Sequence, residues 1–415
     1  MQCIFPIFEH SLQKNAHYRM NRTYLLLIVF AVMAVFSACK KTYKKEVTPS
    51  AMLAISNSNI VELVNIIAAP DGGFVVGANT WKNGNKDFWI LKYNDKFEVQ
   101  WERVLGGAND ETLQKLLVDK DNHVLAAGVS NGFGQDNTLP SLNKKSVLYF
   151  HYIDPNGNTK WETNYPYSNF NNFGPLTSLQ KISDIIQDTD GDFVFTCQRT
   201  HIDASNAVGL VAILSKLSQN GNFTKSYFSA VSNPEFNWPA VFQTGNSYSV
   251  FWNGQFPYKA GFYEILSDSI STQKLKKSTL WNWGDEPRPP DLINELKLRI
   301  NDNLLSYNYF FKNEVYRYMY DLNLKTVSGN TIPLGVDKLQ SVSCSFDNHF
   351  LLASKSGTFY EMDADFKTVN TFETNLILKS FCKLIGGEYV FGIQQDDATL
   401  FLAHYNQKGK LEKPN

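Results

Sequence analysis

The residues that most often carry out chemistry are sparse in this sequence and follow no catalytic spacing. Seven histidines are scattered along 415 residues. His123 and His349 stand at the same place in a repeated turn, which favours a turn role over metal binding. No HExxH, GxSxG or P-loop pattern occurs, and no GxGxxG opens a helix. The sequence therefore predicts no catalytic residue, no bound metal and no cofactor.

Closely spaced carboxylates at 188–192 (DTDGD) resemble the start of a calcium loop, where hard oxygen ligands converge on the ion. The pattern breaks afterwards, because Phe193 and Thr196 stand where glycine and a further acidic ligand would be expected. The segment also coincides with a turn that recurs along the chain. We interpret it as an ordinary turn.

A second acidic group, Asp285, Glu286 and Asp291, could supply the paired carboxylates of a glycosidase. Nearness in sequence is not the geometry that this chemistry needs. A solvated acidic loop is the favoured interpretation.

The N-terminal region has the composition of an export signal. After Met20 the chain carries Arg22 and then the apolar stretch 24–36, which is too short to span a bilayer comfortably. Small residues at 37 and 38 precede Cys39. This arrangement resembles the lipobox of bacterial lipoproteins, which implies lipidation of Cys39, although Phe36 stands where leucine is usual.

We therefore predict a signal peptide at 1–38, with Met20 as the true start, and a lipidated tether at 39–58. Lysines follow Cys39, and the acidic pair that marks surface export in some lipoproteins is missing there. The expected location is the cell envelope, with the lipid in the outer membrane and the protein on the periplasmic side.

Composition and charge narrow the class of protein. Hydrophobic residues make up 43% of the chain and aromatic residues 14%, which favours a globular, strand-rich protein. The net charge of −1 gives no electrostatic reason to expect a nucleic acid partner. Five cysteines without a CxxC pair suggest neither a zinc site nor a disulfide framework.

Two sequence features alternate through the rest of the chain. The first is a tight turn followed by an apolar strand, as in PDGGFVVG, at 70–77, 120–128, 189–196, 244–252, 301–309, 346–354 and 385–393. The second is an alternating strand followed by a polar turn, as in DFWILKYNDK, at 87–96, 147–157, 211–221, 261–269, 315–323, 358–366 and 399–408. Seven copies of each indicate a structural repeat.

Each copy predicts four antiparallel strands, here called a to d in chain order. In the first copy strand a covers 61–68 and strand d covers 99–105. DG, DN and GN dipeptides suit hairpin turns that need positive φ. A four-stranded unit of this kind is a propeller blade, and it cannot bury both of its faces alone. We therefore predict an all-β fold at 59–415, a β-propeller of seven blades, rather than a solenoid.

Two features refine this prediction. The last copy has little chain left for its strand d, so a segment such as 51–56 is a candidate to complete that blade. The segments YNDKFEVQW and IDPNGNTKW, ending in Trp101 and Trp161, are similar to the docking repeat of quinoprotein-like propellers. That resemblance implies that both tryptophans pack between blades. The repeat of this chain also resembles the DGG repeats of uncharacterised bacterial propeller lipoproteins.

The long, irregular segments fall in the b–c and d–a loops, which emerge on one face of a propeller. Functional residues concentrate on such loops because a rigid scaffold positions them. Aromatic side chains suit stacking on a sugar or packing into a protein interface. The candidate ligand-binding residues are Trp81, Tyr165, Tyr167, Trp238, Trp252, Tyr258, Trp281 and Trp283.

The sequence thus favours a monomeric, membrane-tethered binding or scaffold propeller that recognises an envelope protein or glycan through its long-loop face. The alternative is a periplasmic carbohydrate-active enzyme, a hydrolase or lyase, on the same scaffold, because propellers host such activities. A quinone-dependent enzyme is a weaker third reading, since most copies lack the docking motif.

Overall fold

The structure is a computed structural model, and it divides the chain into a unit Met1–Glu46 and a unit Val47–Asn415. All residues that can be described belong to the second unit. They are 52–56, 59–131, 147–165, 176–202, 208–228, 237–254, 259–266, 275–277, 281–282, 294–311, 313–324, 326–336, 339–394 and 399–412. The predicted signal peptide, Cys39 and most of the predicted tether lie outside these residues.

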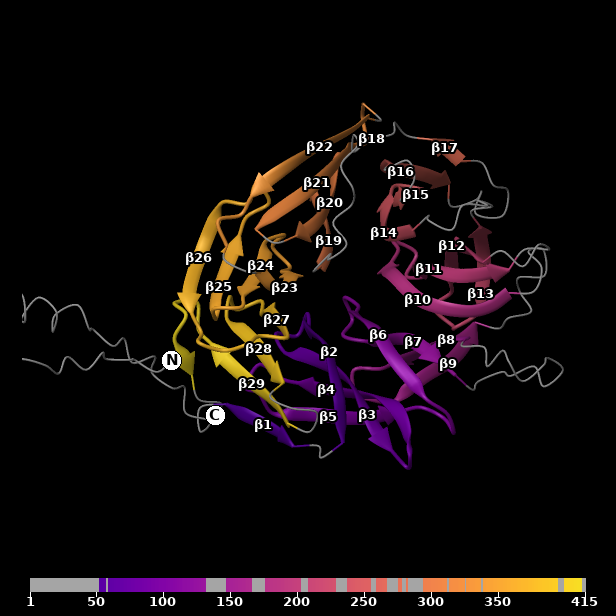
Figure 1. Cartoon of the computed structure of the whole chain (residues 1–415). Helices are drawn as coiled ribbons and strands as arrows, with labels where there is room; N and C mark the ends of the chain where they lie inside the picture. Colours follow the sequence, from indigo (N-terminus) through magenta and orange to yellow (C-terminus); the bar gives the residue numbers. More distant parts are fainter. Residues whose placement is uncertain are drawn as a thin grey trace, which may run out of the picture. The chain divides into compact units, whose positions relative to one another are not determined.

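Six antiparallel sheets, each built from consecutive strands, follow one another around the second unit (Figure 1). Blades 1 to 3 comprise β2 (Ile60–Ala68), β3 (Phe74–Lys82), β4 (Asn85–Tyr93), β5 (Val99–Leu105); β6 (Glu111–Val118), β7 (Val124–Ser130), β8 (Val147–Ile153), β9 (Thr159–Tyr165); and β10 (Leu176–Gln187), β11 (Phe193–Ile202), β12 (Val208–Leu217), β13 (Phe223–Phe228).

Blades 4 to 6 comprise β14 (Asn237–Thr244), β15 (Ser247–Gly254), β16 (Lys259–Leu266), β17 (Leu275–Lys277), with β18 (Trp281–Asn282) also on β16; β19 (Asn294–Asn301), β20 (Leu304–Phe311), β21 (Glu314–Asp321), β22 (Thr326–Pro333); and β23 (Leu339–Cys344), β24 (Phe350–Ser354), β25 (Thr358–Met362), β26 (Thr368–Glu373). The predicted first strand and fourth strand of blade 1 match β2 and β5 closely.

The last sheet joins the two ends of this unit. It contains β27 (Ser380–Lys383), β28 (Tyr389–Gln394), β29 (Thr399–Tyr405) and β30 (Leu411–Glu412), together with β1 (Leu53–Ser56). Both β30 and β1 pair antiparallel with the same edge of β29, so its outer strand is assembled from two pieces. The suggestion that 51–56 completes the last blade is confirmed.

Two details of the prediction need correction. The prediction was seven blades of one kind, but only six of the seven sheets are blades of four consecutive strands; the seventh differs, because too little chain follows β29 to form a full outer strand and β1 supplies the rest. The same pairing removes the end of the predicted tether, since residues 53–56 are a strand in a sheet. The all-β propeller of four-stranded antiparallel blades is confirmed.

Ten hairpin turns in the described residues share one five-residue geometry. The N–H of the first residue donates to the carbonyl of the fifth, and the N–H of the fourth donates to the carbonyl of the first. The fourth residue has positive φ, which explains the glycine or asparagine found there in eight of the ten turns, such as Gly72 at 88° and Asn122 at 64°. The a–b turns are 69–73, 119–123, 188–192, 345–349 and 384–388, and the c–d turns are 94–98, 154–158, 218–222, 363–367 and 406–410.

Neighbouring blades are joined through bulges in the inner strands. A bulge removes a backbone N–H from the strand ladder, and a buried N–H without an acceptor is costly. In blades 2, 3 and 4 a side chain of the preceding blade accepts this bond. The pairs are Leu113 to Asn79 Oδ1 at 2.7 Å, Ile182 to Gln114 Oε1 at 2.7 Å and Val241 to Asp184 Oδ2 at 2.8 Å.

Tryptophan docking between blades is confirmed at both predicted positions. The Trp101 indole N–H donates to the Pro155 carbonyl at 3.0 Å, and the Trp161 indole N–H donates to the Gln219 carbonyl at 2.7 Å. A Cβ on Gly157 would lie 2.7 Å from Trp101, so only glycine lets the ring lie against the next blade's c–d turn.

At other interfaces between neighbouring blades, other residues take the place of the docking tryptophan. Between blade 6 and the last sheet, Asn370 Nδ2 donates to the Gln407 carbonyl at 2.9 Å, and Phe372 lies against Gly409. In two turns the fourth residue is itself aromatic. The Phe97 ring lies 4.4 Å from the His404 ring of the last sheet, and the Phe366 ring lies 6.2 Å from the Phe310 ring of blade 5, centroid to centroid. These three interfaces therefore have an aromatic contact without a docking tryptophan.

Candidate binding surface

The predicted long-loop residues are only partly within the described residues. Trp81 lies at the end of β3 with 46% of its surface exposed, as a ligand-contacting residue requires. For Tyr165 in β9, Trp238 in β14, Trp252 in β15 and Trp281 in β18, the backbone alone is described. Tyr167, Tyr258 and Trp283 lie outside the described residues. Recognition through this face stays a prediction.

Lysines occupy the carboxylate clusters of the a–b turns. In the turn 188–192, Lys216 Nζ lies 2.7 Å from Asp188, 3.7 Å from Asp190 and 3.1 Å from Asp192. Burial lowers the pKa of Lys216, but hydrogen bonds to Asp188 and Asp192 outweigh it and the net pKa rises. The segment that resembled a calcium loop is therefore a turn whose three carboxylates contact an ammonium group.

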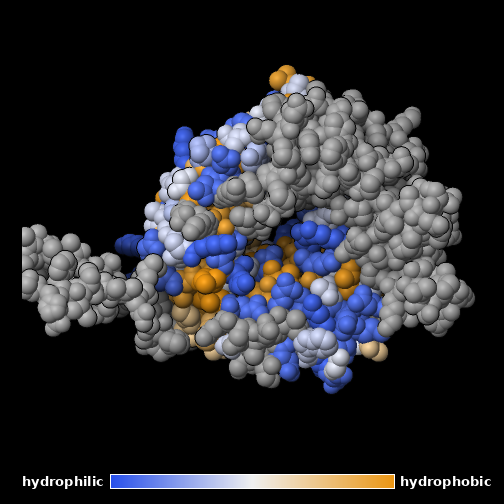
Figure 2. Space-filling view, viewed as in Figure 1, coloured by the Kyte–Doolittle hydropathy of each residue, from blue (hydrophilic) through white to orange (hydrophobic). Residues whose placement is uncertain are grey.

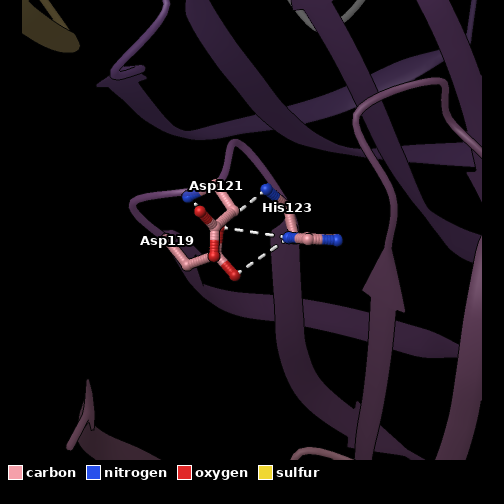
Figure 3. Close-up of side chains that lie close together, drawn as sticks. All are labelled: Asp119, Asp121 and His123. Carbon is pink, nitrogen blue, oxygen red and sulfur yellow. Dashed lines mark hydrogen bonds and ion pairs between the residues drawn. The ribbon is translucent and has the colours of Figure 1, made fainter. Parts of the chain in front are cut away.

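Three groups of described side chains are close enough to share a metal ion: Asp119, Asp121 and His123; Asp347, His349 and Glu361; Glu388, His404 and Glu412. Figure 3 shows the first group, in which the Asp119 carboxylate faces the His123 ring. Asp119 already accepts the N–H groups of residues 121 and 123 at 2.9 and 2.8 Å and the Tyr152 hydroxyl at 2.6 Å. These bonds give His123 and its neighbours a role in shaping the turn.

The second group is also neutralised from within the protein. Lys383 Nζ lies 2.7 Å from both Asp347 and Glu361, and the Tyr389 hydroxyl donates to Glu361 at 2.5 Å. Lys383 and Tyr389 belong to the last sheet, whereas the two acids belong to blade 6. The cluster therefore connects two sheets electrostatically.

A carboxyl pair lies between blades 1 and 2, on the side of the long loops. Asp87 is the third residue of β4 and Glu111 begins β6, and both are at least 95% buried. Burial, reinforced by the charge of Glu111, raises the pKa of Asp87 from 3.8 to about 6. Glu111 accepts the Ser130 hydroxyl at 2.6 Å and the Gly107 N–H at 2.7 Å.

This pair resembles a proton-sharing catalytic dyad, but a substrate cannot reach it. A Cβ on Gly106 would lie 2.0 Å from Asp87 Oδ1 and 2.6 Å from Glu111 Oε2, so the d–a loop lies directly against both carboxyls. The arrangement therefore gives no support to glycoside chemistry at this position, which needs room for a sugar between the acids.

Asp87→Asn is expected to stabilise the protein at neutral pH. The raised pKa means that folding takes up a proton between pH 4 and 6, so this group's contribution to stability falls as the pH rises through that window. The asparagine variant should gain about 2 kcal/mol over the wild type at pH 7.5 and little at pH 4. Urea unfolding midpoints at five pH values measure this difference, and a gain that does not change with pH would contradict it.

A different surface stands out among the described residues, on the side of the a–b turns. Phe346 and Ile385 are the second residues of two adjacent a–b turns, and they are 58% and 59% exposed. The same position holds Lys120 in blade 2 and Thr189 in blade 3. A large apolar side chain is therefore not required by the turn, and its exposure needs another reason.

Between the two side chains the surface is hollowed. A hollow of about 370 Å³ is lined by Phe346, Asp347, Lys383, Ile385 and their turn neighbours. A second hollow of about 280 Å³ shares Phe346 and Lys383 with it and continues along the inner strands β2, β23 and β27. Figure 2 shows hydrophobic residues gathered beside hydrophilic ones over the region of β27 and β28. We call Phe346, Ile385 and these two hollows the turn rim.

No known protein family and no curated protein matches the sequence. Several solved structures are similar to this chain at low sequence identity. The chain is similar to the Dos1 propeller, with a TM-score of 0.49, 10% identity and coverage of 87% of this chain and 86% of that one. It is also similar to BBS1N in complex with ARL6DN, with a TM-score of 0.47, 9% identity and coverage of 85% and 96%.

A third similar structure is BamB from Moraxella catarrhalis, with a TM-score of 0.43, 10% identity and coverage of 84% of this chain and 99% of that one. Within the described residues, no helix has the length and hydropathy needed to cross a membrane.

Proposed function

We propose that the protein is a non-enzymatic binding or scaffold propeller that holds a partner protein of the cell envelope at its turn rim. The observation that carries this proposal is the exposure of Phe346 and Ile385 on adjacent turns. Leaving such side chains in water forgoes about 1.5–3 kcal/mol each relative to burial. Burial against a partner recovers this energy, and apolar side chains beside a hollow are typical of interface centres.

The test replaces both side chains with residues that already occupy the same turn position. Phe346→Lys with Ile385→Thr should leave the urea unfolding midpoint unchanged, because neither side chain is buried in the protein. Co-purification of the partner from solubilised envelopes should fall by at least tenfold. A double variant that keeps its partner, or that unfolds more easily, would count against the turn rim as an interface.

The proposal includes a lipid anchor at Cys39, supported by the apolar stretch and small residues that precede it. The anchor would hold the propeller at the outer membrane, on the periplasmic side. Palmitate labelling tests it: Cys39→Ala should abolish incorporation of the label, and persistent labelling would remove the anchor from the account.

The aromatic residues of the long-loop face support a second recognition surface, for a glycan. Trp81 is the member whose exposure is established. An exposed indole stacks on a sugar ring through its apolar face. A glycan array probed with wild-type and Trp81→Ala protein would separate this surface from the turn rim, where Trp81 plays no part.

A further inference from the structure

The a–b turn 384–388 lacks the internal cap that most of its counterparts have. In blade 3, Asp188 Oδ1 accepts the N–H groups of Asp190 at 3.0 Å and Asp192 at 2.9 Å. The first residue of the turn 384–388 is Leu384, which has no acceptor and is 4% exposed in the core. Within the described residues, no protein acceptor binds the N–H of Gly386 or of Glu388.

Blade 1 demonstrates how such a turn can be completed from outside. Its first residue is Ala69, and the N–H of Asp71, the third residue, donates to Asn122 Oδ1 at 3.0 Å. Asn122 is the fourth residue of the a–b turn in the following blade. The N–H of the third residue can thus be reached by an oxygen atom that belongs to another segment.

The counterpart of Asn122 for the turn 384–388 is Gly72, the fourth residue of the a–b turn in blade 1. Glycine has no side chain with which to reach Gly386. The turn nevertheless keeps its shape, since Gln407 Nε2 donates to the Gly386 carbonyl at 2.6 Å, as Gln219 does to Asp190 in blade 3. The N–H of Gly386 therefore stays available for an acceptor.

The neighbouring turn repeats the same deficiency. Ser345 Oγ accepts the N–H of His349 at 3.1 Å, and no protein acceptor within the described residues binds the N–H of Asp347. The two donors, Asp347 and Gly386, each follow one of the exposed apolar side chains, Phe346 and Ile385. Donors and apolar surface thus alternate along the turn rim, as needed to bind an extended peptide.

The surrounding charges indicate which oxygen would bind. Asp347 pairs with Lys383 at 2.7 Å, and Glu388 with His404 at 2.9 Å. The Lys383 ammonium and the His404 ring are already bonded to these acids, and a further carboxylate would lie beside two half-exposed carboxylates. A neutral carbonyl oxygen accepts the same hydrogen bonds without that repulsion.

We infer that the turn rim is the receptor for an extended, uncharged segment of the partner protein, whose main-chain carbonyl oxygen accepts the Gly386 N–H while a large apolar side chain packs between Phe346 and Ile385. This inference rests on the proposed function and specifies the partner's chemistry. Recognition would then use the N–H groups of Asp347 and Gly386, the third residues of their turns. In the other three a–b turns of this five-residue type, the N–H of the third residue donates to a side chain of the same turn or of the next blade.

Gly72→Asn tests the inference by supplying the missing internal acceptor. Asparagine is compatible with the positive φ of 88°, as Asn122 and Asn348 demonstrate, and a Cβ there would meet no atom closer than 3.8 Å. Gly72→Ala is the matched control, because it changes the backbone freedom and adds no acceptor. The probe is a dodecapeptide library displayed on phage and selected on the full chain in detergent.

Selected peptides should carry a large apolar residue without net charge and should bind Gly72→Ala within threefold of the wild type. Their affinity for Gly72→Asn should be at least tenfold lower. Peptide binding should also slow hydrogen exchange of the segment 385–388, a readout that does not depend on any variant folding.

Two results would overturn the inference, and they differ in what they leave standing. Peptides that lose affinity for Phe346→Lys with Ile385→Thr but bind Gly72→Asn like the wild type would remove the backbone receptor and keep the binding surface. A selection that enriches nothing over that double variant would remove the receptor and the proposed function together.

Discussion

Trp101→Ala is expected to lower the free energy of unfolding by about 3–5 kcal/mol, the usual cost of removing a buried tryptophan. The side chain is 6% exposed and lies in the core shared by blades 1 and 2. Its loss opens a cavity between two blades and leaves the Pro155 carbonyl without the indole donor. Urea unfolding followed by intrinsic fluorescence or circular dichroism measures the change.

Trp81→Ala is the matched control for that substitution, since Trp81 belongs to the same blade and is 46% exposed. Its unfolding free energy should stay within about 0.5 kcal/mol of the wild type, as for most surface changes. Equal destabilisation by the two substitutions would mean that Trp101 does not connect the blades.

Removal of the apolar side chains of β1 is expected to be nearly as costly. Ile55 is 7% exposed in the core between the last sheet and blade 1, and Leu53 packs on the same core. Replacing both with alanine should cost about 3 kcal/mol or more, the range for large-to-small changes in a core. The loss of stability should be greatest at the interface between the last sheet and blade 1. Hydrogen exchange in β29 should therefore accelerate more than exchange in β11.

Ala54 lies between these two residues on the same strand and is exposed. Ala54→Ser should therefore leave stability within about 0.5 kcal/mol of the wild type. If Leu53→Ala with Ile55→Ala proves equally harmless, β1 does not close the propeller and the residues belong to the tether after all.

The sequence predicted the fold well where a rule is local and repeated. The turn 69–73 and strand β5 could be placed from a DG dipeptide and an alternating pattern, because positive φ and strand faces leave a direct mark on residue types. The docking of Trp101 was predictable for a similar reason, since the glycine beside it and the tryptophan both recur at fixed spacing.

What the sequence did not reveal depends on contacts between neighbouring blades and on exposure. Asn370 with Phe372, and Phe97 with His404, fill the place of a docking tryptophan, but neither has a recognisable pattern. The exposure of Phe346 and Ile385 was missed because a pattern of apolar residues does not distinguish a buried side chain from an exposed one at the tip of a turn. Comparison with Lys120 and Thr189 at the same turn position was the available signal.

The acid pair Asp87 and Glu111 was also outside the reach of sequence reasoning. The two residues lie near the starts of strands in different blades and are 24 positions apart, so only the packing of blades 1 and 2 brings them together. Their burial under Gly106 then decides that they affect stability rather than a substrate.

Site-specific photo-crosslinking in intact cells tests most directly whether the turn rim binds a partner protein. A photoreactive amino acid is placed at position 346, and, in a separate strain, at position 120, the same turn position in blade 2. The account predicts one discrete crosslinked protein from position 346 and none from position 120. Crosslinking that is absent at 346, or equal at both positions, would contradict it.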